Sequence, residues 1–114
     1  MNSPNTENLI VEDKSSYKIV WDSKNIRENR INLYYSEDNG KKWKPIAKDI
    51  SNKGYFNWII PNLKTIDCIF KVESSVEPKI YSISKYSMKI TEKALIVIEN
   101  NFNDKKYIAL DSIN

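Results

Sequence analysis

Apolar and polar residues alternate with a period of two along most of this chain, which is the pattern of β-strands with one buried face. The alternating runs recur roughly every 10 to 14 residues and are separated by Asn, Gly, Pro and Ser, as in an all-β sandwich or barrel. No stretch shows a convincing helical pattern. We predict seven strands, at residues 17–22, 31–36, 43–46, 54–61, 67–74, 79–84 and 86–90.

The alternation also predicts which side chains point into the core, because successive residues of a strand face opposite sides of the sheet. The residues expected to face inward are Tyr17, Ile19, Trp21, Ile31, Leu33, Tyr35, Phe56, Trp58, Ile60, Cys68, Phe70, Val72, Met88 and Ile90. Trp43 opens its strand and is expected inward as well. The predicted fold is an antiparallel β-sandwich of about seven strands over residues 17–90.

The two ends of the chain differ from this central region. Residues 1–16 are polar and are expected to form an N-terminal arm. After Ile90 the alternation restarts, and residues 91–114 are predicted to form a C-terminal hairpin that either covers an edge of its own domain or docks on a neighbouring subunit. The apolar residues expected to make that contact are Leu95, Val97, Ile98, Tyr107, Ile108 and Leu110.

Composition narrows the functional classes. The chain has 114 residues, enough for one domain with its own core, and 40% of them are hydrophobic. No run approaches the ~20 apolar residues of a membrane helix, and no basic segment followed by an apolar one indicates a secretory signal. The net charge is only +3, the lysines are interspersed with acids, and arginine is almost absent, so we expect no nucleic-acid partner.

Few residues could carry chemistry. There is no histidine and a single cysteine, which excludes an intrachain disulfide, a Cys/His zinc site and histidine-based catalysis. Cys68 is expected to be a small core residue. Asp22, Asp38 and Asp49 lie on or near predicted turns, but their spacing matches no calcium-binding loop. We therefore expect no metal, no cofactor and no enzymatic activity.

The stretch SEDNGKKW at residues 36–43 resembles the Asp-box of sialidases and related β-propellers. A propeller needs several copies at spacings of ~40 to 50 residues, and this chain has one. Asn39-Gly40 is a strong signal for a tight hairpin turn, because both residues tolerate positive φ. Four residues are therefore predicted to brace a turn: Ser36, Asp38, Gly40 and Trp43.

A longer series of motifs covers residues 19–90. The stretches IVWDSKNIRENRINLYYSEDNGKKWKPIA, GYFNWIIP, CIFKV and SKYSMKI together resemble the fibronectin III-like or Ig-like modules of bacterial surface and secreted proteins. The residues that match that pattern are Trp21, Tyr35, Trp43, Gly54, Trp58, Pro61, Cys68 and Ile90, while Met88 replaces the usual Phe. The resemblance implies an Ig-like sandwich, and it specifies fold better than function because these positions belong mostly to the core.

The resemblance also suggests a setting. Modules of this kind usually belong to secreted multidomain chains, whereas this one begins at Met1 without a recognisable signal. Bacteriophage particles assemble in the cytoplasm and display Ig-like domains, so we expect a non-enzymatic virion component that docks on capsid, neck or tail proteins, with homo-oligomers as an option. This component would be a capsid decoration or auxiliary protein, or a small tail protein.

Two other interpretations stay open. One is a carbohydrate-binding or adhesive module of a bacterial surface protein, extracellular or at the cell surface within a larger assembly. The tryptophans are favoured as core residues, so a glycan would instead require an outward row of tyrosines, namely Tyr34, Tyr55, Tyr81 and Tyr86. The other is an accessory domain of a cell-surface enzyme.

Overall fold

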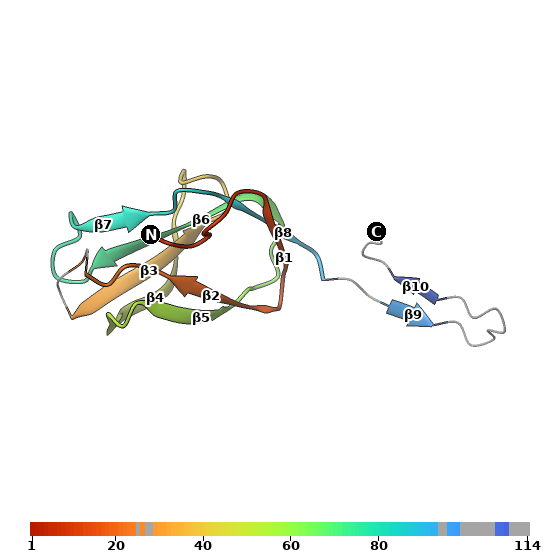
Figure 1. Ribbon diagram of the computed structural model, residues 1–114, viewed down its shortest axis with the longest axis horizontal. Coiled ribbons are helices and arrows are strands. Elements are labelled where there is room, and N and C mark those ends of the chain that lie inside the picture. The colour runs from red at the N-terminus through yellow and green to blue at the C-terminus, as the bar shows by residue number, and fades with distance from the viewer. Residues whose placement is uncertain (25, 27–28, 94–95, 99–106, 110–114) are drawn as a thin grey trace.

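Figure 1 shows a computed structural model of the chain, in which the described residues are 1–24, 26, 29–93, 96–98 and 107–109. Every regular element in these residues is a strand, which confirms the predicted all-β class. No helix long and apolar enough to cross a membrane occurs among the described residues.

The larger sheet contains six strands in the order β1-β8-β6-β3-β4, with β7 also paired to β6. Their bounds are β1 (Leu9–Glu12), β3 (Arg30–Ser36), β4 (Lys44–Ser51), β6 (Thr65–Ser74), β7 (Tyr81–Ile83) and β8 (Met88–Thr91). The long strand β6 organises this sheet, because β3 pairs along one of its edges while β8 and β7 share the other.

The smaller sheet is the antiparallel pair of β2 (Ser16–Val20) and β5 (Tyr55–Ile59). Its inner side packs on the larger sheet through aromatic rings. The ring of Phe70 on β6 lies 5.8 Å from the ring of Tyr17 and 5.5 Å, edge to face, from that of Trp58. Edge-to-face packing is favourable because the positive ring edge meets the negative ring face.

The core between the sheets contains the side chains that the alternation predicted. The buried cluster consists of Ile19, Trp21, Ile26, Ile31, Leu33, Trp58, Ile60, Leu63, Cys68, Phe70, Val72, Met88 and Ile90. The other residues predicted to face inward, Tyr17, Tyr35 and Phe56, are partly buried and pack against this cluster. The period-two pattern therefore predicted the inward faces of these strands correctly.

Residues 1–16 differ from the predicted polar arm. Within them β1 pairs in parallel with β8, with Leu9 opposite Met88 and Val11 opposite Ile90. The Met1 ammonium donates a hydrogen bond of 2.7 Å to Ser82 Oγ. The alternation does not predict β1, because this strand has only four residues within a polar segment and its partner strand is distant along the chain. Eight strands therefore build the two sheets, one more than the seven expected.

The C-terminal strands β9 (Ile96–Ile98) and β10 (Tyr107–Ala109) pair antiparallel and form a separate two-stranded sheet. Figure 1 shows this hairpin beyond the end of the sandwich where β1 and β8 lie. Of the residues predicted to make an interaction there, Leu95 and Leu110 lie outside the described residues. The others, Val97, Ile98, Tyr107 and Ile108, belong to β9 and β10.

Candidate functional site

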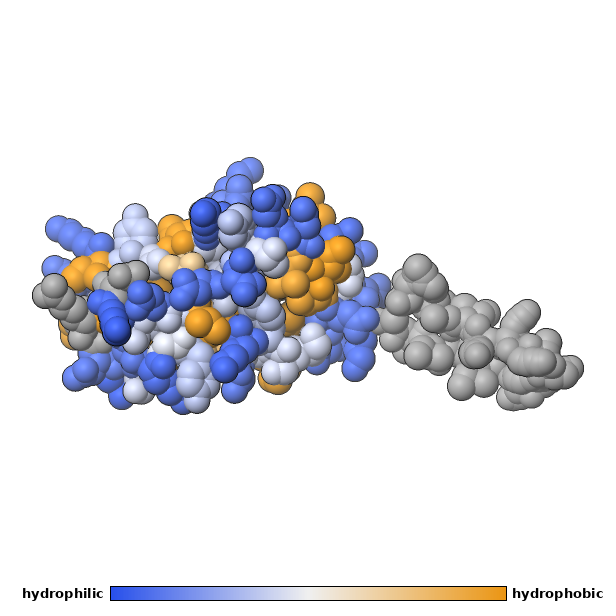
Figure 2. Space-filling view, in the orientation of Figure 1, coloured by the Kyte–Doolittle hydropathy of each residue, from blue (hydrophilic) through white to orange (hydrophobic). Residues whose placement is uncertain are grey.

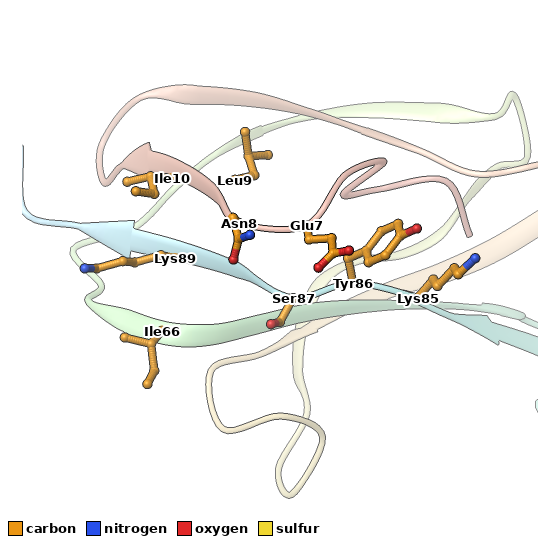
Figure 3. Close-up of a pocket in the computed structure, with 9 residues that line it drawn as sticks. All are labelled: Glu7, Asn8, Leu9, Ile10, Ile66, Lys85, Tyr86, Ser87 and Lys89. Atoms are coloured by element: carbon orange, nitrogen blue, oxygen red, sulfur yellow. The ribbon is translucent and has the colours of Figure 1, made fainter.

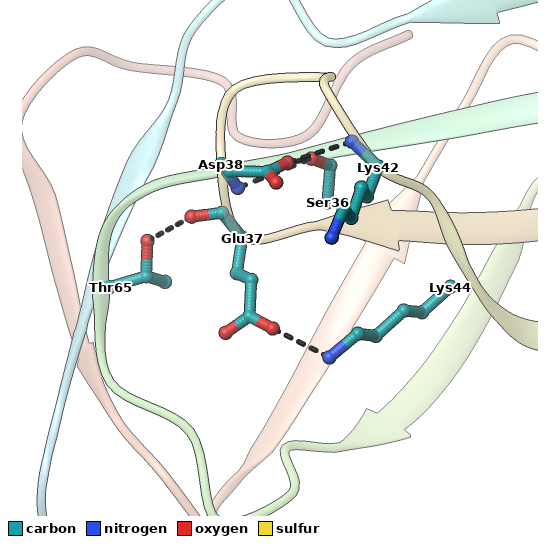
Figure 4. Close-up of polar contacts among 6 residues, drawn as sticks. All are labelled: Ser36, Glu37, Asp38, Lys42, Lys44 and Thr65. Carbon is teal, nitrogen blue, oxygen red and sulfur yellow. Dashed lines mark hydrogen bonds and ion pairs between the residues drawn. The ribbon is translucent and has the colours of Figure 1, made fainter.

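Hydrogen bonds join Ser36, Asp38, Gly40 and Lys42 at the turn after β3, and Figure 4 shows those of Ser36, Asp38 and Lys42. The Ser36 hydroxyl donates to Asp38 Oδ1 at 2.7 Å and accepts from the amide of Gly40 at 2.8 Å. Asp38 Oδ1 also accepts from the amide of Lys42 at 2.9 Å. The Ser36 hydroxyl and this amide lower the pKa of Asp38, because both stabilise the carboxylate. These contacts hold the backbone of the turn.

The backbone of this turn requires its Asn-Gly pair. Asn39 has φ of 60° and Gly40 has φ of 93°, which most residues adopt only with strain. A Cβ atom on Gly40 would lie 3.5 Å from Ile69 Cδ1 and 3.6 Å from Trp43 Cζ2. Trp43 therefore covers the turn from outside, where it is only partly buried. The expectation that all three tryptophans face the core is wrong for Trp43, because it precedes β4 in a loop.

Trp43 belongs to a group of aromatic rings on the outer face of the larger sheet. Its other members are Tyr34 on β3 and Tyr81 on β7, and Lys71 on β6 lies between them. The Lys71 ammonium is 4.9 Å from the ring centroid of Trp43, 5.1 Å from that of Tyr34 and 6.0 Å from that of Tyr81. We call Tyr34, Trp43, Lys71 and Tyr81 the outer aromatic cluster.

Strand register brings the cluster together. Tyr34 lies directly opposite Lys71 in the β3–β6 pair, and Tyr81 lies opposite Glu73 in the β6–β7 pair. Since alternate residues of β6 share a face, Lys71 and Glu73 both point outward from the core. The cluster thus combines residues from three strands and one loop, which no local pattern in the sequence reveals.

Glu73 fixes the orientation of Tyr34. Its carboxylate Oε2 accepts hydrogen bonds from the Tyr34 hydroxyl at 2.8 Å and from Asn32 Nδ2 at 2.9 Å. Glu73 is only 8% exposed although it lies on the outer face. Asn32 in turn accepts from the amide of Asp49 through Oδ1, at 2.8 Å. Partial desolvation, and then the hydrogen bond to Glu73, raises the pKa of Tyr34.

The four tyrosines expected to form one outward row are divided over the molecule. Tyr34 and Tyr81 meet in the outer aromatic cluster. Tyr55 lies on β5 in the smaller sheet, with the ammonium groups of Lys18 and Lys53 at 4.8 Å and 5.0 Å from its ring centroid. Tyr86 lines a groove over β1 and β8. The prediction that these four rings form a single linear row is therefore wrong.

That groove has a volume of ≈ 450 Å³ and lies over β1, β8 and the start of β6 (Figure 3). Ile10 and Ile66 flank Lys89 in it, and both isoleucines are more than half exposed. Figure 2 shows apolar surface gathered over β1 and β8 at this end of the sandwich. The groove combines apolar side chains with the polar groups of Glu7, Lys85 and Ser87.

The carboxylates and the single thiol of the described residues form no cluster that could bind a metal ion. No group of His, Cys, Asp or Glu side chains within the described residues could hold a metal ion, and Asp22, Asp38 and Asp49 do not converge. Burial raises the pKa of the Cys68 thiol to about 12, so the thiol is neutral at physiological pH. The Cys68 side chain packs in the core, as expected.

The outer aromatic cluster is the residue group that sequence reasoning missed. The sequence predicts Tyr34 and Tyr81 as outward aromatic residues, but it assigns Trp43 to the core and gives Lys71 no role in a site. One signal in the sequence could have indicated the cluster: Tyr34 and Lys71 both occupy alternating positions that point outward from their strands. Comparison of the chain with protein-family models, with curated proteins and with solved structures found no match.

Proposed function

We propose that this chain is a non-enzymatic Ig-like module that docks on other proteins through its C-terminal hairpin. The strand order supports the Ig-like part of the proposal. In Ig domains strands G, F, C and C′ form one sheet and B and E belong to the other. Here β8-β6-β3-β4 face β2-β5, so β6 corresponds to F and β3 to C.

The separate sheet of β9 and β10 is the observation that carries the docking proposal. An isolated two-stranded hairpin is marginally stable in water, and a third strand or a packing surface is needed for independent stability. In the described part of the chain, β9 and β10 pair with each other and with no strand of the sandwich. A partner strand added to this hairpin would satisfy its unpaired edge groups.

A bacteriophage particle is the setting we propose for this docking. The support is the resemblance of residues 19–90 to Ig-like modules, which such particles display. The chain would be a capsid decoration or auxiliary protein, or a small tail component, and capsid, neck or tail proteins would be its partners. A module of a bacterial surface assembly is the alternative setting, and it uses the same hairpin contact.

Hydrogen exchange of the purified chain tests the docking proposal. We expect the amides of β9 and β10 to exchange rapidly in the monomer, while those of β3 and β6 remain protected by the sandwich. Analytical ultracentrifugation across a concentration series identifies the monomer, and self-association with protection of β9 would identify a second copy as partner. Amides of β9 and β10 protected as strongly as those of β6 in a strict monomer would overturn the proposal.

A truncation provides the matched control. Removing residues 93–114 leaves the entire buried cluster, which lies between residues 19 and 90. The sandwich amides should therefore keep their protection in the shortened chain. Any self-association or particle binding that survives the truncation would show that the hairpin is not the docking element.

A further inference from the structure

The outer aromatic cluster is a surface that the core does not need. Tyr81 is 56% exposed, and Tyr34 and Trp43 are partly exposed, on the face of the larger sheet that points away from β2 and β5. Large exposed aromatic side chains are concentrated at binding sites, because their rings offer contact area with little conformational freedom to lose. The cluster therefore has the composition of a ligand platform.

We propose that Tyr34, Trp43 and Tyr81, with Lys71 between them, form a binding site for an anionic carbohydrate. The ligand class is a sugar that carries carboxylate or sulfate groups on its rings. This activity goes beyond protein docking and uses a different face of the molecule from the hairpin.

The rings provide the apolar half of the site. The C–H faces of a sugar ring are apolar and can lie flat on an aromatic ring, which removes both surfaces from water. Tyr34 is held for this purpose, because its hydroxyl donates to the buried Glu73 carboxylate, and Glu73 is itself held by Asn32. A ring fixed before binding loses less entropy when the ligand arrives.

Lys71 and Lys48 provide the charged half. The Lys48 ammonium lies 5.7 Å from the ring centroid of Tyr34, so two ammonium groups flank that ring. Within the described residues neither lysine forms an ion pair, whereas the nearby cations Arg30 and Lys44 are paired with acids. Lys71 and Lys48 therefore remain available to a ligand carboxylate or sulfate.

The position of Lys71 explains why the ligand should be anionic. A neutral sugar that stacks on Tyr34 or Trp43 must displace the Lys71 ammonium from the rings, which removes a favourable cation–π contact. An anionic sugar replaces that contact with a charge-assisted hydrogen bond to the same ammonium. Anionic sugars should therefore bind more tightly than neutral sugars of equal size.

Charge argues against a nucleic acid as the ligand. Single-stranded nucleic acids need a basic groove that follows successive phosphates, together with stacking rings. Here two lysines lie at the rings without an ion pair in the described part of the chain, and the Glu73 carboxylate accepts a hydrogen bond from the Tyr34 hydroxyl. Such a site fits isolated anionic groups on a sugar chain better than a continuous phosphate backbone.

The test is titration of the full chain with tetragalacturonate, which carries a carboxylate on each ring, and with neutral cellotetraose. Tryptophan fluorescence reports binding, because Trp21 and Trp58 are buried while Trp43 is accessible. Amide chemical shifts in NMR spectra locate the site. We expect shifts at Tyr34, Trp43, Lys71 and Tyr81 with tetragalacturonate, and about tenfold weaker binding of cellotetraose, equivalent to about 1.4 kcal/mol.

Two pairs of variants provide matched controls. Lys71→Gln and Tyr81→Ala should each weaken tetragalacturonate binding about tenfold. Lys18→Gln and Tyr55→Ala remove the same residue types from the smaller sheet and should leave binding unchanged. Circular dichroism and thermal unfolding of each variant show whether it is folded, and Tyr81 is exposed enough that its removal should not unfold the sandwich.

Several results would overturn the proposal. One is the absence of any chemical-shift change at millimolar tetragalacturonate. Another is an equal response to hexaglutamate or to an oligothymidylate, which would show that charge alone or a different polymer accounts for binding. Shifts centred on Tyr55 would place the site elsewhere. Hydrogen exchange of β9 and β10 is a separate readout, so failure of the hairpin proposal is distinguishable from failure of this one.

Discussion

The two faces of the β3–β6 pair carry different kinds of side chain, although the same two strands form both. The inner face presents Leu33, Phe70 and Val72, each completely buried against the smaller sheet. The outer face presents Tyr34, Lys71 and Glu73, joined by a cation–π contact and a hydrogen bond. Burial of apolar surface explains the inner face. On the outer face the side chains contact one another in a fixed arrangement, although solvent-exposed side chains need only contact water.

The buried carboxylate on the outer face is the clearest sign of this difference. A surface glutamate normally extends into water, but Glu73 is almost covered and accepts two hydrogen bonds. Burying a charged group is unfavourable unless hydrogen bonds compensate for lost hydration. The outer face therefore has a defined geometry that depends on the Glu73 carboxylate.

The largest effect should come from the inner face. Phe70→Ala removes the ring that contacts both Tyr17 and Trp58, and we expect the free energy of unfolding to fall by about 3–5 kcal/mol. Urea unfolding followed by circular dichroism measures the change. A loss below about 1 kcal/mol would mean that the two sheets are not held together by this ring stack.

The next effect should come from the buried carboxylate. Glu73→Ala leaves the Tyr34 hydroxyl and the Asn32 amide without their acceptor, and we expect a loss of about 1–3 kcal/mol. The same urea measurement on Tyr34→Phe and on the double variant gives the coupling between the two groups. Additive single effects would show that the hydrogen bond of 2.8 Å between them contributes little.

The turn after β3 should be less costly to perturb. Ser36→Ala removes the donor to Asp38 and the acceptor for the amide of Gly40, and we expect a loss of about 1 kcal/mol. Thermal unfolding should show the loss without a change in the outer aromatic cluster. Chemical shifts of Lys71 and Tyr81 that move as far as those of the turn would contradict a local brace.

Asp38 should make the stability of this turn depend on pH. Its pKa in the folded protein is lowered by the Ser36 hydroxyl and the amide of Lys42, so folding favours the carboxylate. The resulting stability is present above the unfolded-state pKa and is lost as pH falls through the folded-state pKa. Urea midpoints measured between neutral and acid pH should decline less steeply for Asp38→Asn, and identical slopes would contradict this role.

The smallest effect on stability should come from Tyr81. This residue is 56% exposed, so Tyr81→Ala should change the free energy of unfolding by no more than about 0.5 kcal/mol. Urea unfolding beside Tyr55→Ala gives the comparison with an exposed tyrosine of the other sheet. A much larger loss for Tyr81→Ala would mean that the outer face is part of the folding core.

Much of the fold could be predicted from alternation alone. Ile19, Phe70 and Ile90 were assigned inward because a buried strand face repeats every second residue. β1 was missed because four residues give a weak signal and its partner β8 is far along the chain. Trp43 was wrongly assigned to the core, because inward and outward positions alternate only within a strand and this residue precedes β4.

The candidate site was harder to predict for a related physical reason. Side-chain parity showed that Tyr34 and Lys71 face outward, but it did not show that they lie opposite each other. That contact depends on the register between β3 and β6, and the position of Tyr81 depends on where β7 joins β6. Registers are set by core packing and turn geometry together.

The sequence by itself determined an all-β protein, the inward faces of its strands and the tight turn at Asn39-Gly40. These features follow from local rules, since strand periodicity and positive φ are properties of neighbouring residues. Only the tertiary structure decided that β1 joins the larger sheet, that Glu73 is buried on an outer face, and that three aromatic rings surround Lys71. Each of these depends on contacts between residues distant in sequence, which form only when the two sheets pack.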